Sequence, residues 1–132
     1  MEKNKEISTI RLLLVEDLPS YSHELKEWLT IFGYQHIEEA VSAAEAEEKL
    51  DTPYDVIISD MRMEENTSGF TVLEEIKRRN ISSIVIILTA NDNVRHCRDA
   101  FKLGVTDYIS KNWRDNIFAM VDKSFQTNTL HF

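Results

Sequence analysis

The sequence predicts an α/β fold, a doubly wound, five-stranded parallel sheet with helices on both faces. Stretches that are apolar, except for Arg11, occur at Ile10 to Val15, Val56 to Ile58 and Ile84 to Leu88. Runs of this length that are rich in Val and Ile suit strands buried on both faces. Helical periods fill the gaps, so the order is strand then helix five times over. With right-handed crossovers, this order gives a parallel sheet covered by helices on both faces.

Two weaker strand candidates complete the sheet. His36 to Val41 carries the alternation Ile37, Glu39 and Val41, and Val105 to Ser110 is the last candidate before the C-terminal helix. Period-two alternation is typical of a strand with one face buried.

The first helix is well marked. Pro19 suits a first helical turn, and Gly33 suits the left-handed position after the last turn. Apolar side chains repeat on one face between them, at Tyr21, Leu25, Trp28, Leu29 and Phe32.

The second and third helices have their own signals. Ser42 with Glu45 three residues later forms a capping box that opens a short helix towards Leu50, which Pro53 closes. A third helix is predicted from Phe70 to Arg79, with the pairs Glu74–Arg78 and Glu75–Arg79 four residues apart and an inward face of Val72, Leu73 and Ile76.

The fourth and fifth helices are predicted from apolar spacing alone. The fourth ends at Gly104, and the fifth leads into a tail from Gln126 to Phe132 that we expect to fray. Their inward residues are Val94, Cys97 and Phe101 in the fourth, and Ile117, Phe118, Val121 and Phe125 in the fifth.

Length and composition favour one globular domain over residues 1–132. Of the 132 residues, 42% are hydrophobic and 29% are charged, and no apolar run approaches the roughly 20 residues needed to cross a bilayer. Met1 to Ser8 carries no stretch of signal-peptide length, and the single cysteine, Cys97, reads as a small buried hydrophobe. We therefore expect a soluble, cytoplasmic protein without direct membrane contact. The net charge of -8 argues against direct nucleic-acid binding, which needs clustered Lys and Arg.

Polar residues follow four of the predicted strands, at the edge where ligands bind in open parallel sheets. They are Glu16 and Asp17 after the first, Asp60 after the third, Thr89 after the fourth and Lys111 after the fifth. Asp17 or Thr89 taken alone is better explained as a helix cap or turn former. Together, however, the three carboxylates would repel one another and need a cation. Carboxylate oxygens suit Mg2+, which leaves positions open for phosphate oxygens, while a lysine and a hydroxyl could contact a phosphoryl group.

Several short motifs resemble the receiver domains of two-component response regulators, in both order and spacing. The similarity covers the chain from about Ile10 to about Phe125. We expect the domain core to have the same limits, about residues 10 to 125. It implies a flavodoxin-like fold of the receiver type. The motifs are Leu14-Val15-Glu16-Asp17, Ile58-Ser59-Asp60-Met61-Arg62-Met63, Ser68-Gly69-Phe70, Ile87-Leu88-Thr89-Ala90 and Gly104-Val105-Thr106-Asp107-Tyr108-Ile109-Ser110-Lys111.

The resemblance implies a role for each matching residue. Asp60 matches the phosphoacceptor. Mg2+ would be held by Glu16, Asp17, Asp60 and the backbone carbonyl of Arg62. The residues that match the phosphoryl-binding and switch positions are Thr89, Tyr108 and Lys111.

The resemblance also implies partners. They are a sensor histidine kinase or histidine phosphotransfer protein as donor, and a downstream output protein or domain. A second copy of the chain could bind through the fourth helix, fifth strand and fifth helix, from Val94 to Phe125. Beyond its own phosphorylation and dephosphorylation, the domain is not expected to be an enzyme.

Two positions depart from the family pattern. Asn112 stands where the family usually has proline after the lysine. The loop from Met63 to Ser68 carries Glu64, where the family often has proline, and is about one residue longer than usual. In the family, the peptide bond before the proline that follows the lysine is often cis. A cis peptide bond before Asn112 would cost roughly 2.5 to 4 kcal/mol, against about 0.5 to 1 kcal/mol before proline.

Three other classes compete with this interpretation. A pseudo-receiver that signals without phosphorylation predicts loss of one or more of Asp17, Asp60, Thr89 and Lys111, all of which are present. A phosphoaspartate hydrolase of the haloacid-dehalogenase type has two aspartates separated by one residue after the first strand, a pattern missing here. A flavin-binding electron carrier needs a loop rich in Ser, Thr and Gly where this chain has Asp17.

Overall fold

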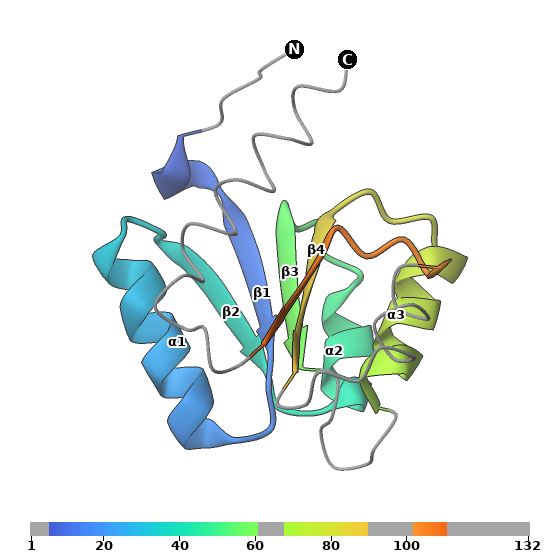
Figure 1. The fold of residues 1–132 in the computed structure, drawn as a ribbon. Helices are drawn as coiled ribbons and strands as arrows, with labels where there is room; N and C mark the ends of the chain where they lie inside the picture. Colours follow the sequence, from blue (N-terminus) through green and yellow to red (C-terminus); the bar gives the residue numbers. More distant parts are fainter. Residues whose placement is uncertain (1–5, 61–67, 90–101, 111–132) are drawn as a thin grey trace.

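The computed structural model describes residues 6–60, 68–89 and 102–110. These residues form a central sheet with helices packed against it (Figure 1). A short 3-10 turn, η1 (Ile7–Thr9), precedes the first strand. In the described part of the chain, no helix is both long enough and apolar enough to cross a membrane.

The strands form a parallel sheet in the order β2-β1-β3-β4-β5. The register places Val15 beside Ala40 on one side and Ser59 on the other, and Asp60 beside Leu88. All carboxyl ends therefore lie at one edge, which confirms the predicted parallel sheet. The strands are β1 (Arg11–Val15), β2 (His36–Ala40), β3 (Val56–Asp60), β4 (Ile84–Thr89) and β5 (Asp107–Ser110).

The burial of each strand follows its place in the sheet. Leu12–Val15 in β1 and all of β3 are buried, as expected for strands with neighbours on both sides and helices above and below. Edge strand β2 alternates instead between exposed and half-buried residues, up to the buried Ala40. It ends at Ala40, so Val41, the last residue of the predicted strand, lies beyond the observed strand and is 55% exposed.

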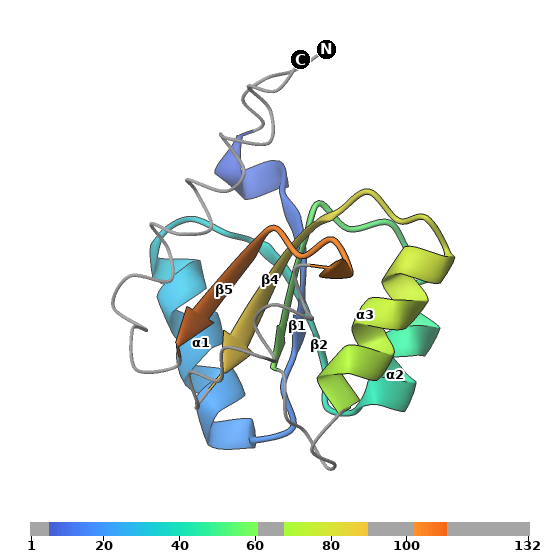
Figure 2. The same cartoon turned by 45° about the vertical axis from the view of Figure 1, so that its right-hand side comes forward.

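Helices α1 (Pro19–Ile31), α2 (Ala43–Lys49) and α3 (Ser68–Arg78) flank the sheet. Figures 1 and 2 show α1 on one side and α2 with α3 on the other. Leu25 and Leu29 of α1 pack against Leu12 and Leu14, whereas Val72 of α3 belongs to the core on the opposite face. The predicted fourth and fifth helices lie largely outside the described residues, so the complete arrangement of five strand–helix units stays a prediction.

The ends of α1 and α2 match their sequence signals. Gly33 has a φ of +107°, and the N–H of Tyr34 donates to the Leu29 carbonyl at 3.0 Å, the pattern of a left-handed helix end. At the start of α2, the N–H of Glu45 donates to Ser42 Oγ at 3.1 Å. The Glu45 carboxylate in turn accepts from the N–H of Val41 at 2.7 Å. The capping residues Ser42 and Glu45 are thus confirmed.

Helix α3 begins at Ser68, two residues before the predicted start, and ends one residue before the predicted Arg79. The predicted pair of Glu75 and Arg79 forms, at 2.7 Å. Arg78 also contacts Glu75, rather than Glu74 as predicted. These two guanidinium groups lower the pKa of Glu75 to about 2.

Candidate functional site

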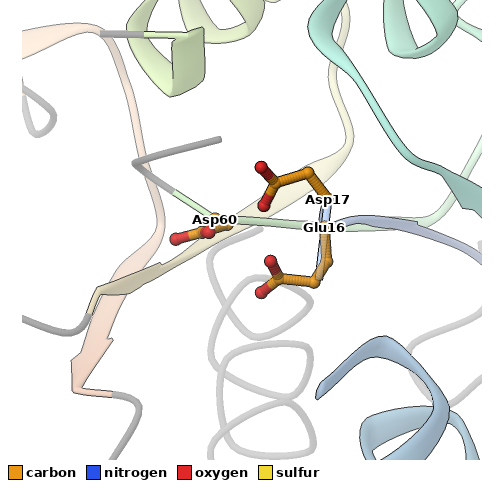
Figure 3. A group of neighbouring side chains, drawn as sticks. All are labelled: Glu16, Asp17 and Asp60. Atoms are coloured by element: carbon orange, nitrogen blue, oxygen red, sulfur yellow. The ribbon is translucent and has the colours of Figure 1, made fainter. Parts of the chain in front are cut away.

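Three carboxylates gather at the carboxyl ends of two neighbouring strands (Figure 3). Glu16 and Asp17 directly follow β1, and Asp60 is the last residue of β3. One ligand oxygen of each residue lies within 4.8 Å of the others. Glu16 is 1% exposed and Asp60 is 2% exposed, whereas Asp17 is half-buried. The structure thus brings together the three acidic residues that the sequence analysis predicted as a cluster.

The pairing of β1 with β3 explains why these side chains meet. Val15 pairs with Ser59, so the next residues, Glu16 and Asp60, lie side by side at this end of the sheet. In Figure 3 the carboxylates of Glu16 and Asp17 extend to the side of the strand end on which Asp60 lies. A shift of β1 by one residue would turn each of its side chains to the opposite face and disperse the cluster.

The backbone around Glu16 holds this residue at two points. Its N–H donates to the Ala40 carbonyl of β2 at 3.0 Å, which extends the β1–β2 ladder by one bond. Its Oε2 accepts a hydrogen bond from the N–H of Leu18 at 3.2 Å. Leu18 is the residue before the first turn of α1, so the start of this helix helps to orient the Glu16 carboxylate.

The donor set fits a hard divalent cation. Carboxylate oxygens are the protein ligands that Mg2+ and Ca2+ prefer, and Mg2+ binds them at roughly 2.1 Å, so opposite ligands are about 4.2 Å apart. The 4.8 Å spread of the three oxygens is close to that separation. Like charges this close raise the free energy of the folded state unless a cation compensates. The three residues could therefore hold one ion after a small contraction.

The other predicted site residues are only partly placed. Thr89 ends β4, and its backbone pairs with Ser110 at the end of β5, so it lies at the same edge as the carboxylates. Tyr108 lies in β5 opposite Ile87. The side chains of Thr89 and Tyr108, and the whole of Arg62 and Lys111, lie outside the part of the chain that the structure describes.

The sequence analysis did not single out Ser22 and Lys26, which both contact Glu39 of β2. Ser22 of α1 is 3% exposed, and its hydroxyl donates to Glu39 Oε1 at 2.5 Å. Lys26 contacts the other oxygen of Glu39 at 3.2 Å. The Ser22 hydrogen bond is the main cause of the lowered pKa of Glu39. A polar residue at position 22, in helical register with buried Leu25 and Leu29, is the signal that could have revealed this contact.

Comparison with known proteins identifies the family. Residues 12–122 match the family model of the response regulator receiver domain, which is most of the chain. The chain belongs to this receiver family. The resemblance found in the sequence motifs is thereby confirmed.

Individual relatives agree with this assignment. The chain is 31% identical over 132 residues to the transcriptional regulatory protein CiaR of Streptococcus pneumoniae, an alignment that covers 93% of the chain and 57% of CiaR. It is 28% identical to the chemotaxis protein CheY of Bacillus subtilis, with 86% of the chain and 96% of CheY covered. The chain thus spans little more than half of one relative and nearly all of another.

A solved receiver domain has the same fold. The receiver domain of the Francisella response regulator 1452 is 25% identical, with a TM-score of 0.81 and coverage of 91% of this chain and 99% of that one. This likeness supports the predicted flavodoxin-like receiver fold.

Proposed function

We propose that this receiver domain accepts a phosphoryl group on Asp60 from the phosphohistidine of a sensor histidine kinase or histidine phosphotransfer protein. The observation that carries the proposal is the gathering of Glu16, Asp17 and Asp60 within 4.8 Å at the end of β1 and β3. Membership of the response regulator receiver family supports it. The proposal includes Mg2+ as cofactor, held by these three side chains and the backbone carbonyl of Arg62.

The chemistry needs little beyond position and charge. A carboxylate oxygen of Asp60 attacks the phosphorus, a new P–O bond forms, and the P–N bond to the donor histidine breaks. Bound Mg2+ would supply neutralisation of the charge on the phosphoryl oxygens. Glu16 and Asp17 have no covalent role, since their part is to hold the cation beside Asp60. Lys111 is proposed to pair with a phosphoryl oxygen, which adds a further fixed positive charge.

We propose that phosphorylation of Asp60 changes the structure of another part of the domain, which partners then bind. The hydroxyl of Thr89 follows the phosphoryl group and Tyr108 changes rotamer with it, so that the segment from Val94 to Phe125 has two arrangements. This segment would contact an output protein, an output domain or a second copy of the chain. The complete fold would then contain five strand–helix units with helices on both faces.

The domain's own catalysis would be limited to its phosphorylation and dephosphorylation, and its place of action would be the cytoplasm. The chain spans 57% of CiaR, so the output process of that whole protein is not carried over to this domain. A phosphorylation-independent interaction module of the same fold is the rival function, and the experiment below separates the two.

The test uses a small phosphodonor and a matched pair of aspartates. Asp55 directly precedes β3 and Asp60 ends it, so Asp55→Asn and Asp60→Asn make the same change at opposite ends of one strand. Asp55 Oδ2 accepts the N–H of Arg11 at 2.9 Å, a bond that an asparagine oxygen can still accept. Each protein is incubated with acetyl phosphate and Mg2+ and then weighed intact by mass spectrometry.

We expect one phosphoryl group on the wild type and on Asp55→Asn, and none on Asp60→Asn, with all three proteins folded by circular dichroism. Omission of Mg2+ should suppress the reaction. A wild type that gains no phosphate from acetyl phosphate or from a phosphorylated donor histidine would favour the phosphorylation-independent module. Full phosphorylation of Asp60→Asn at the wild-type rate would assign the acceptor to another residue.

A further inference from the structure

A continuous chain of hydrogen bonds leads from the edge strand β2 to the acidic cluster. The Ser22 hydroxyl donates to Glu39 Oε1 at 2.5 Å. The backbone N–H of Ser22 donates to the Leu18 carbonyl at 2.9 Å, the first hydrogen bond of α1. The N–H of Leu18 donates to Glu16 Oε2 at 3.2 Å. Three consecutive bonds therefore connect the carboxylate of Glu39 to that of Glu16.

A second connection runs between the same two strands. Glu39 is followed by Ala40, whose carbonyl accepts the Glu16 N–H at 3.0 Å. Glu16 is thus attached through its backbone to the residue next to Glu39, and through its side chain to the helical turn that contains Ser22. The backbone attachment belongs to the β1–β2 ladder, whereas the side-chain attachment depends on the position of the first turn of α1 relative to β2.

The N-terminus of α1 has no side-chain cap. Its N-cap residue is Leu18, which has no side-chain oxygen, and no side-chain hydrogen bond caps this end. Leu18 is also 53% exposed, so packing restrains its side chain weakly. Ser22, by contrast, is 3% exposed, and a buried hydroxyl has a strong preference for a bonded partner. The Ser22–Glu39 bond is therefore well placed to fix the first turn.

We propose that Ser22 and Glu39 are positioning residues that orient the Glu16 carboxylate towards a divalent cation through the Leu18 N–H. This inference rests on the proposed function, because it concerns the same acidic cluster. Lys26 has a minor part, since its contact with Glu39 is partly exposed and screened by solvent. Groups that orient metal ligands change metal affinity by roughly 10- to 100-fold when removed. Ser22 acts through two further bonds, so we expect a change of about three- to tenfold.

The test compares hydroxyl deletions on one helix. Ser22→Ala removes the donor to Glu39, whereas Thr30→Ala removes a hydroxyl that donates only locally, to the Lys26 carbonyl at 2.7 Å. Glu39→Gln keeps an oxygen that can accept from Ser22, and Glu39→Leu does not. Two quantities are measured far below the unfolding temperature. They are the dissociation constant of Mg2+ by titration calorimetry and the hydrogen-exchange protection of the Leu18 amide in the metal-free protein.

We expect Ser22→Ala and Glu39→Leu to weaken Mg2+ binding about three- to tenfold and to reduce protection of the Leu18 amide. Glu39→Gln and Thr30→Ala should stay within about twofold of the wild type. At saturating Mg2+, the rate of phosphorylation by acetyl phosphate should be little changed in all four, because the deficit lies in binding the cation.

The outcomes separate this inference from the proposed function. If the wild type binds Mg2+ and is phosphorylated, but Ser22→Ala matches it in Mg2+ affinity and Leu18 protection, the positioning role is wrong and the proposed function stands. If Ser22→Ala lowers only the unfolding temperature, the bond merely fixes the helix, and the inference also fails. If the wild type neither binds Mg2+ nor is phosphorylated, the proposed function fails, and the inferred role towards a cation fails with it.

Discussion

The two ends of the sheet differ in their charges: like charges gather at the carboxyl end, whereas opposite charges pair at the amino end. At the carboxyl end, three carboxylates lie within 4.8 Å of one another. At the amino end, the Glu38 carboxylate accepts the Tyr54 hydroxyl at 2.9 Å and lies 3.9 Å from Arg11 and 3.8 Å from Lys49. The Arg11 guanidinium also lies over the Tyr54 ring, 5.9 Å from its centre.

This difference separates a structural polar network from a binding site. Opposite charges and hydrogen bonds at the amino end stabilise the fold in the metal-free protein. Like charges at the carboxyl end do the reverse until a cation binds. Size does not make the distinction, because a cavity of about 560 Å³ lies at the amino end, beside Arg11, Glu38 and Tyr54. The charged residues that line this cavity, Arg11 and Glu38, already form an ion pair with each other. The arrangement of charge is therefore a better guide to function than the size of a cavity.

The largest expected effect tests the carboxyl end through its response to metal. Mg2+ at a hundred times its dissociation constant should raise the free energy of unfolding by about 2.7 kcal/mol, because only the folded cluster binds it. Asp17→Asn should remove most of this gain. The same change should stabilise the metal-free protein by at least about 1 kcal/mol, because repulsion between charges about 4 Å apart has that size in bulk water and is larger where the charges are buried. Urea denaturation with Mg2+ and with EDTA measures both quantities.

A matched aspartate provides the control for Asp17→Asn. Asp51 is exposed and contacts Arg79 at 2.9 Å, away from the cluster. Asp51→Asn should cost less than about 1 kcal/mol, as exposed ion pairs do, and should leave the Mg2+ response unchanged. An equal Mg2+ response in Asp17→Asn and the wild type would remove Asp17 from the set of metal ligands.

The next effect tests the amino end through pH. Burial, followed by the hydrogen bond to Glu38, raises the pKa of Tyr54 to about 12. The unfolded chain ionises this phenol near pH 10, so the stability that Tyr54 contributes is complete below pH 10 and is lost as pH rises through 12. At pH 7, Tyr54→Phe should cost about 1 kcal/mol for the lost hydroxyl. Denaturation of both proteins from pH 8 to 12 should show this advantage shrinking above pH 10. An advantage that stays constant to pH 12 would contradict the raised pKa.

Much of the sheet could be predicted because buried parallel strands leave a simple pattern. The run Leu12–Val15 is apolar throughout since both its faces are covered, and the residues that follow such runs must meet at one edge. The last strand is less regular. It begins at Asp107 rather than Val105, because the Thr106 hydroxyl accepts the Val85 N–H at 3.1 Å in place of a backbone oxygen. A side chain thus replaces the first ladder bond, which β-propensity does not reveal.

The contacts around Glu16 could not be predicted in the same way. The bond from Ser22 to Glu39 joins residues 17 positions apart, on a helix and an edge strand whose separation is set by tertiary packing. Within a single helix, the rotamer of a side chain also decides which neighbour it contacts, and the sequence does not determine that rotamer. Arg78 contacts Glu75 instead of Glu74, although both glutamates are within reach of helical spacing. Sequence pattern therefore locates the acidic residues of the site, and only the structure reveals what orients them.

The smallest expected effect compares the two ends directly in salt. Lys49→Gln removes one partially exposed contact to Glu38, so it should cost about 0.5 kcal/mol or less in dilute buffer. In 1 M KCl, where the screening length is about 3 Å, this cost should vanish. The stabilisation of the metal-free protein by Asp17→Asn should persist in larger part, because Glu16 and Asp60 are 1% and 2% exposed and buried charges are screened much less. Urea denaturation of the two variants and the wild type in 0.05 M and 1 M KCl decides the matter. If both effects vanish together, the carboxylates behave as solvated surface charges, and the contrast between the two ends is wrong.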